Sequence, residues 1–147
     1  MFDRKECMKI QLLAAILGAI NIYAAEVPDS LIQALIQIES NGNDLAVGDV
    51  NLANPAFGCL QIRQPCVTDV NRKLATNYRA EECLGNRGLS IRICREYLNL
   101  YATEKRVGHK PTLEDYARIW NGGPNGFRKT STEDYWRKVK RFLKMYT

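Results

Sequence analysis

The sequence is poor in residue types that many catalytic and metal sites require. Its 147 residues include one histidine, His109, which stands in a Gly-His-Lys-Pro segment. A Ser-His-Asp or Cys-His catalytic centre would have to use that residue, and no nucleophile signature lies near it. The chain also has no Cys-x-x-Cys pair, so its cysteine spacing is not typical of zinc sites. We therefore expect no metal and no cofactor, and we expect His109 to be a solvated loop residue.

Low-complexity segments and internal repeats are also absent from the sequence. The composition, 46% hydrophobic and 25% charged, is ordinary for a globular protein. A chain of this length suits one domain with a hydrophobic core. Beyond the N-terminal segment no stretch is apolar for long enough to cross a bilayer. We expect a monomer without a stable membrane span after removal of the N-terminal signal.

The first 25 residues differ from the rest of the chain. Three basic residues precede an apolar run from 12 to 20, and alanines follow at 24 and 25. This layout is typical of a secretory signal peptide, and an uncleaved membrane anchor is the alternative. We therefore assign residues 1–25 to a signal peptide and residues 26–147 to the mature domain. The expected location is secreted or periplasmic.

Four cysteines lie in the mature domain. They are Cys59, Cys66, Cys83 and Cys94. In a small secreted domain this number predicts two disulfide bonds, with three possible connectivities. The short separations favour Cys59–Cys66 and Cys83–Cys94, and buried reduced thiols are the alternative.

The charge of the chain is positive. The net charge is +5, and residues 1–25 carry three positive and two negative groups, so about +4 belongs to the mature domain. A basic secreted protein is attracted to anionic polymers. Several basic residues crowd the last segment: Arg137, Lys138, Lys140, Arg141 and Lys144. We interpret them as a solvated helix face, because export and the lack of any nucleic-acid motif argue against a nucleic-acid partner.

Hydrophobic periodicity predicts a mainly helical domain with one small hairpin. Helices are expected at Pro28–Ser40, from Pro65, at Ser90–Arg106, after Thr112 and at Thr132–Tyr146. Capping boxes are predicted at Ser30 with Gln33 and at Thr112 with Asp115. Between residues 44 and 63, Gly, Asn, Asp and Pro predict a loop-rich stretch with an antiparallel hairpin, ending in a strand-like Cys-Leu-Gln-Ile. The expected fold class is α+β.

One acid lies beside the apolar face of the first helix. Glu39 is four residues from Leu35 and three from Ile36. A carboxyl group against apolar side chains is poorly solvated, which raises its pKa and keeps a proton available near neutral pH. Glycoside cleavage uses such an acid to protonate the leaving oxygen. The alternative is a helix-end glutamate that points to water.

Four short motifs follow in order along the chain: ESNGN (39–43), GCLQI (58–62), IWNGG (119–123) and DYWRKV (134–139). The set resembles the lysozyme-like lytic transglycosylases of the SLT-domain type. The AVGD…AFGCLQI stretch is also similar to the invertebrate-type and goose-type lysozymes. The resemblance covers about residues 28–145, and it implies a mainly helical lysozyme-like fold with a small hairpin after the catalytic helix.

The resemblance also implies roles for individual residues. Glu39 would be the general acid and then the base, and Ser40 would help to fix its orientation. Gln61 would hydrogen-bond the substrate, Asn121 would lie beside the cleft, and Tyr135 would stand near the acid.

Two positions depart from the family pattern. Trp120 stands where the family usually has a tyrosine before the asparagine, and its ring face could stack on a sugar. Cys59 stands in the Gly-x-x-Gln motif, where a disulfide could hold the strand.

Enzymes of both kinds cleave the β-1,4 bond between N-acetylmuramic acid and N-acetylglucosamine in peptidoglycan glycan strands. A lysozyme requires a second carboxylate, whereas a lytic transglycosylase can use one acid because the muramic acid 6-hydroxyl closes a ring. Asp49 is the better candidate for the second carboxylate, ahead of Asp44, although both also suit turns. We predict a non-hydrolytic lytic transglycosylase. The alternatives are a hydrolytic lysozyme that uses Asp49, and a cell-wall glycan-binding module without catalysis.

Overall fold

The computed structural model describes residues 26–145 of the chain. The predicted signal peptide at 1–25 and the predicted end of the last helix at Tyr146 lie outside this range. Within it, every helix is too short or too polar to cross a membrane.

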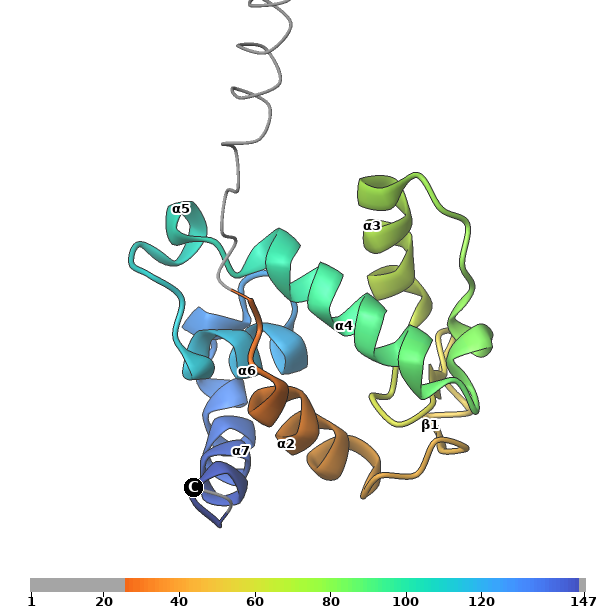
Figure 1. Ribbon diagram of the computed structural model, residues 1–147, viewed down its shortest axis with the longest axis horizontal. Helices are drawn as coiled ribbons and strands as arrows, with labels where there is room; N and C mark the ends of the chain where they lie inside the picture. The colour runs from red at the N-terminus through yellow and green to blue at the C-terminus, as the bar shows by residue number, and fades with distance from the viewer. Residues whose placement is uncertain (1–25, 146–147) are drawn as a thin grey trace, which may run out of the picture.

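The described chain is mainly helical (Figure 1). The α-helices are α2 (Asp29–Ser40), α3 (Gln64–Leu74), α4 (Arg87–Tyr101), α5 (Glu104–Val107), α6 (Leu113–Gly122) and α7 (Glu133–Met145). Short 3-10 turns are η1 (Ala80–Cys83), η2 (Gly126–Arg128) and η3 (Thr130–Thr132), and the strands are β1 (Val47–Gly48) and β2 (Ala56–Phe57). The predicted α+β class, with a small antiparallel hairpin after the first helix, is confirmed.

Helix α2 runs through the centre of the core. Leu31, Ile32 and Leu35 are completely buried, because α2 packs against both α6 and α7. The long helix α4 crosses the molecule and packs against α3, while the hairpin lies near the N-terminal end of α4 (Figure 1). The end of α2 therefore points into the region between the helical part and the hairpin.

Local sequence signals explain several of the helix boundaries. Pro65 lies in the first turn of α3, and Thr112 and Asp115 form the predicted capping box of α6. The capping box predicted at Ser30 is wrong, because the helix already begins at Asp29 and places Ser30 inside its first turn. The helix predicted at Ser90–Arg106 is also wrong in its extent. It ends at Tyr101, and the Thr103 hydroxyl accepts the Arg106 N–H to begin the separate helix α5.

The hairpin pairs Val47 with Phe57 and Gly48 with Ala56. The strand predicted for Cys-Leu-Gln-Ile is instead a tight turn, which an isolated bridge between Phe57 and Ile62 closes. Gly58 has φ +74°, and a Cβ there would lie 2.4 Å from the Cys83 carbonyl oxygen, so only glycine fits. This turn brings the following residues back toward α2.

The four cysteines of residues 26–145 are free thiols, so the expected disulfides Cys59–Cys66 and Cys83–Cys94 are not formed. Cys59, Cys83 and Cys94 are buried in the apolar core, where a thiol packs as a small hydrophobic group. Burial raises the pKa of Cys83 to about 11, which leaves this thiol protonated and unreactive at neutral pH.

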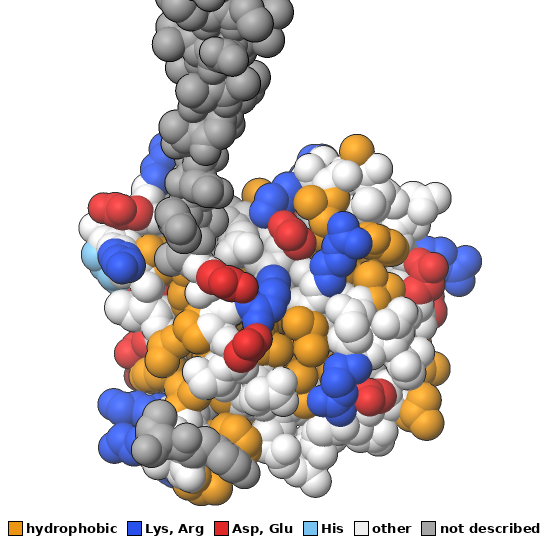
Figure 2. All heavy atoms as spheres, viewed as in Figure 1, with side chains coloured by type: hydrophobic (Ala, Val, Ile, Leu, Met, Phe, Trp, Pro, Cys, Tyr) orange, Lys and Arg blue, Asp and Glu red, His pale blue; other side chains and the backbone are white. Residues whose placement is uncertain are grey.

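The last helix is strongly amphipathic. Val139 is fully buried, whereas the basic residues of the opposite face are exposed: Arg137, Lys138, Lys140, Arg141 and Lys144. Figure 2 shows basic side chains gathered at the end of the molecule where α7 lies. The predicted solvated helix face is therefore confirmed.

Candidate active site

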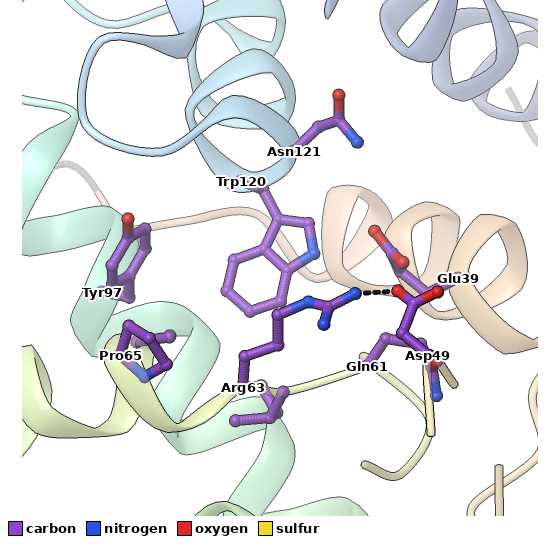
Figure 3. Close-up of a pocket in the computed structure, with 10 residues that line it drawn as sticks. Glu39, Asp49, Gln61, Arg63, Pro65, Tyr97, Trp120 and Asn121 are labelled. Carbon is purple, nitrogen blue, oxygen red and sulfur yellow. Dashed lines mark hydrogen bonds and ion pairs between the residues drawn. The ribbon is translucent and has the colours of Figure 1, made fainter. Parts of the chain in front are cut away.

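A cavity of about 370 Å³ lies where α2, the hairpin, the start of α3 and the end of α6 meet. Its lining consists of Glu39, Asp49, Gln61, Ile62, Arg63, Pro65, Cys66, Tyr97, Trp120 and Asn121. Five of the seven residues predicted for the site therefore lie around one cavity (Figure 3). The other two, Ser40 and Tyr135, lie behind it.

Glu39 occupies the last turn of α2 and its side chain reaches the cavity (Figure 3). The helix stops directly after it, because Asn41 adopts a left-handed conformation at φ 54°. The Tyr135 hydroxyl donates a hydrogen bond to Glu39 Oε1 over 2.7 Å. Burial raises the pKa of the Glu39 carboxyl, while hydrogen bonds from Tyr135 and Trp120 and the charge of Arg63 lower it by less. The result is a raised pKa, as a general acid requires.

Asp49 places a second carboxylate in the same cavity. It lies in the loop after β1, with φ 49°, a conformation that aspartate tolerates better than most residues. Its carboxylate forms an ion pair with Arg63 (Figure 3). The Arg63 guanidinium also donates to the Asn54 carbonyl. Asp44, the other candidate, pairs with Arg87 at 3.0 Å and is not part of the cavity lining. Of the two candidate acids, only Asp49 lines the cavity.

Gln61 lines the cavity, but from a turn rather than from the predicted strand. Its side-chain amide donates to the carbonyls of Gly58, at 3.0 Å, and Ala46, at 3.4 Å. The Nε2 group therefore holds the hairpin to the turn. The side-chain oxygen lies beside Gly48, where a Cβ would come within 2.1 Å of it.

Trp120 and Asn121 lie in the last turn of α6 and line the cavity. The Trp120 ring meets the Tyr97 ring edge to face, with 6.0 Å between centroids. Figure 3 shows the indole between Tyr97 and Glu39. This placement leaves an aromatic surface beside the acid, which suits stacking of a sugar ring.

Ser40 and Tyr135 support Glu39 from behind. The Ser40 hydroxyl donates to the Cys59 carbonyl at 2.8 Å, which ties the end of α2 to the turn at Gly58–Gln61. Tyr135 comes from α7 and holds the acid through its hydroxyl. Both residues contact the acid or its helix rather than the cavity.

Sequence reasoning missed Arg63 and Tyr97 as members of the site. Arg63 directly follows the GCLQI motif and precedes α3, so its position was a usable signal. Tyr97 lies in α4, and no sequence feature shows that the apolar face of this helix opens into a cavity. In the part of the chain that the structure covers, no group of three or more His, Cys, Asp or Glu side chains is placed to hold a metal ion.

No protein-family model matches the chain. A "Lysozyme" from Ostrea edulis is 27% identical over 131 residues, which cover 89% of this chain and 92% of that protein. An "Invertebrate-type lysozyme" from Ruditapes philippinarum is 27% identical over 107 residues, covering 73% and 75%. "Lysozyme 1" from Crassostrea virginica is 40% identical over 60 residues, and this match spans 41% of this chain but only 32% of that relative's length.

Solved structures show the same arrangement of elements. The inhibitor-bound lysozyme from Meretrix lusoria has a TM-score of 0.66 at 23% identity, and the match covers 78% of this chain and 89% of that one. The Tapes japonica lysozyme has a TM-score of 0.64 at 25% identity, with the same coverage. The chain has a lysozyme-like fold. The relatives and structural neighbours are lysozymes, and one of them is named as the invertebrate type, which supports the lysozyme-like part of the predicted resemblance.

Proposed function

We propose that this lysozyme-like chain is a glycosidase that cleaves the β-1,4 bond between N-acetylmuramic acid and N-acetylglucosamine in peptidoglycan. The observation that carries the proposal is the Glu39 carboxyl, whose pKa burial raises at the edge of an open cavity beside the Trp120 ring. A protonated acid at this place can donate to the glycosidic oxygen as the bond breaks. The lysozyme relatives support an enzyme of this class.

We further propose hydrolysis as the outcome. The predicted lytic transglycosylase reaction finds no support among the relatives, which are lysozymes. The hydrolytic alternative requires a second carboxylate, and Asp49 lines the same cavity as Glu39. Arg63 keeps the Asp49 carboxylate oriented at the cavity edge, where it can stabilise positive charge on the sugar or activate water.

The remaining roles follow from this assignment. The glycan contacts Gln61, Trp120 and Asn121, which line the cavity. Ser40 and Tyr135 act on Glu39 and not on substrate. Peptidoglycan strands are the proposed partner, and secretion or export to the periplasm brings the enzyme to them.

Digestion of purified peptidoglycan, followed by mass spectrometry of the soluble fragments, tests the proposal. We expect wild-type fragments with reducing muramic acid ends, and no fragments from Glu39→Gln. Fragments with 1,6-anhydro ends would show that the transglycosylase alternative is correct. If the folded wild-type protein released no fragments but still bound the strands, the chain would be a binding module. Asp49→Asn should lower the rate by orders of magnitude, and full activity would remove Asp49 from the mechanism.

A further inference from the structure

A second cavity lies at the opposite end of α4 from the hairpin, and we call it the Arg106 pocket. Its volume is about 410 Å³, and its lining is Leu100, Thr103, Lys105, Arg106, Asn125 and Arg128. These residues come from the end of α4, from α5 with its N-terminal cap, and from η2 with the residue before it. None of them lines the cavity that contains Glu39.

The lining of the Arg106 pocket is basic. Three of its six lining residues are basic and none is acidic. Seven other arginines of the described chain form ion pairs with carboxylates, whereas the ion pairs found among residues 26–145 include none with Lys105, Arg106 or Arg128. Positive groups that converge on a concave surface without a counter-charge raise the local potential and attract anions.

Neighbouring side chains orient the arginines of the pocket. The Arg106 guanidinium lies over the Tyr101 ring, 5.2 Å from its centroid, and donates to Asn125 Oδ1 at 3.4 Å. Arg128 lies over the Phe127 ring at 4.9 Å. Stacking on a ring face leaves the edge of the guanidinium available, and its planar fork matches the oxygens of a phosphate group. The Thr103 hydroxyl and the Lys105 ammonium add donors of the same kind.

A row of aromatic rings joins the two cavities. Trp120 and Tyr97 line the first cavity, and the Tyr97 ring contacts the Tyr101 ring with 4.8 Å between centroids. The Tyr101 ring in turn stacks against the Arg106 guanidinium. Packed side chains therefore connect the two cavities, from Trp120 at the first to the Arg106 guanidinium at the second.

We propose that the Arg106 pocket binds phosphate groups of an anionic cell-wall polymer, a polyol chain linked by phosphodiesters. The choice of this ligand rests on the proposed function, because a peptidoglycan-cleaving enzyme works where such polymers lie beside the glycan. The chemistry of recognition rests on the pocket alone. Binding at this site holds the enzyme on the wall while Glu39 acts on successive strands.

Binding of soluble poly(glycerol phosphate) to the full mature chain tests the proposal, with Glu39→Gln as the background. This polymer has no β-1,4 glycan bond, so the result does not depend on whether the chain cleaves peptidoglycan. We expect Arg106→Gln with Arg128→Gln to weaken binding roughly tenfold or more, the loss expected for one or two charge-assisted hydrogen bonds. The salt dependence of binding should also decrease. The matched control is Lys140→Gln with Arg141→Gln on α7, which removes the same charge and should change the affinity less than about twofold.

Two further measurements show which phosphate compound binds and which residues form its binding site. Inorganic phosphate at high concentration should compete with the polymer, and backbone amide signals of 103–106 and 125–128 should shift when polymer is added. Equal weakening by the two double variants, or signals that shift only in α7, would show general attraction to a basic protein and overturn the proposal. Binding of inorganic phosphate without binding of the polymer would overturn the wall-polymer ligand.

Discussion

The hydrogen bond from Tyr135 to Glu39 gives a direct test of how the fold controls the pKa of Glu39. Tyr135→Phe removes the hydroxyl that donates to Glu39 Oε1 at 2.7 Å and keeps the ring in place. Burial raises the pKa of Tyr135 well above its ordinary value, so its hydroxyl remains a donor at any working pH. A hydrogen bond to a charged group contributes about 1.5–3 kcal/mol. Its loss disfavours the carboxylate form, and the ratio of carboxylate to acid falls roughly 10- to 150-fold at a given pH.

The expected result is a shift of the alkaline limb of the pH–activity profile to higher pH. Glu39 must be protonated to start the reaction, and loss of the Tyr135 bond raises its pKa further. Initial rates of fragment release from peptidoglycan, measured across the pH range in which the protein stays folded, give the position of that limb.

Tyr101→Phe is the matched control for this experiment. It removes a hydroxyl that donates to the Asp69 carboxylate, also at 2.7 Å, outside the cavity that contains Glu39. Its alkaline limb should coincide with that of the wild type. An unchanged limb in Tyr135→Phe, or a shift to lower pH, would refute the assignment of Glu39 as the titrating acid.

Three further predictions concern stability. Glu39→Gln should raise the Tm at neutral pH. Burial raises the pKa of Glu39 in the folded protein, so the carboxyl stabilises the fold fully only below its unfolded pKa and loses that contribution as the pH rises. The difference in Tm between the variant and the wild type should therefore disappear in acid. Gly126→Ala should lower the free energy of unfolding in urea by about 1–3 kcal/mol or more, because a Cβ there would lie 1.9 Å from a backbone carbonyl oxygen of α6. Gly88→Ala in α4 is the control: a Cβ there would lie 3.8 Å from its nearest neighbour, and the free energy of unfolding should rise by up to about 1 kcal/mol. Asp115→Asn should destabilise the start of α6 in melts at neutral pH and less so in acid. Burial favours a higher pKa of Asp115, but the hydrogen bonds of Thr112 and His109 to its carboxylate together outweigh burial and lower the pKa. A lowered pKa gives stability that is lost as the pH falls through it.

The helices and the acid could be predicted because both depend on local signals. The apolar period of Leu31–Ile38 fixes the buried face of α2, and that face carries Glu39 to the edge of the core. The capping box at Thr112 depends on residues three apart, so its sequence contains the whole interaction. Such features need no knowledge of the tertiary fold.

The remaining features depend on contacts between distant segments. The Cys-Leu-Gln-Ile stretch alternates as a strand would, but Gly58 packs against the carbonyl of Cys83 and turns the chain. The ion pair of Arg63 with Asp49 joins residues 14 apart, and its geometry depends on the hairpin loop. Cysteine number alone suggested disulfides, because composition does not show whether thiols meet in bonding geometry or pack separately in a core.

The raised pKa of Glu39 and the stability of α2 have one physical origin. Leu35 and Ile36 are buried because α6 and α7 cover α2, and the same covering removes water from the Glu39 carboxyl at the end of the helix. The Tyr135 hydroxyl, supplied by α7, then replaces part of the lost solvation. A mutation that admits water to the Glu39 carboxyl while keeping the Tyr135 hydrogen bond would therefore lower the pKa of the acid as well as the stability of the fold. The packing that keeps water from Glu39 is also the packing that stabilises the fold, so the two properties change together.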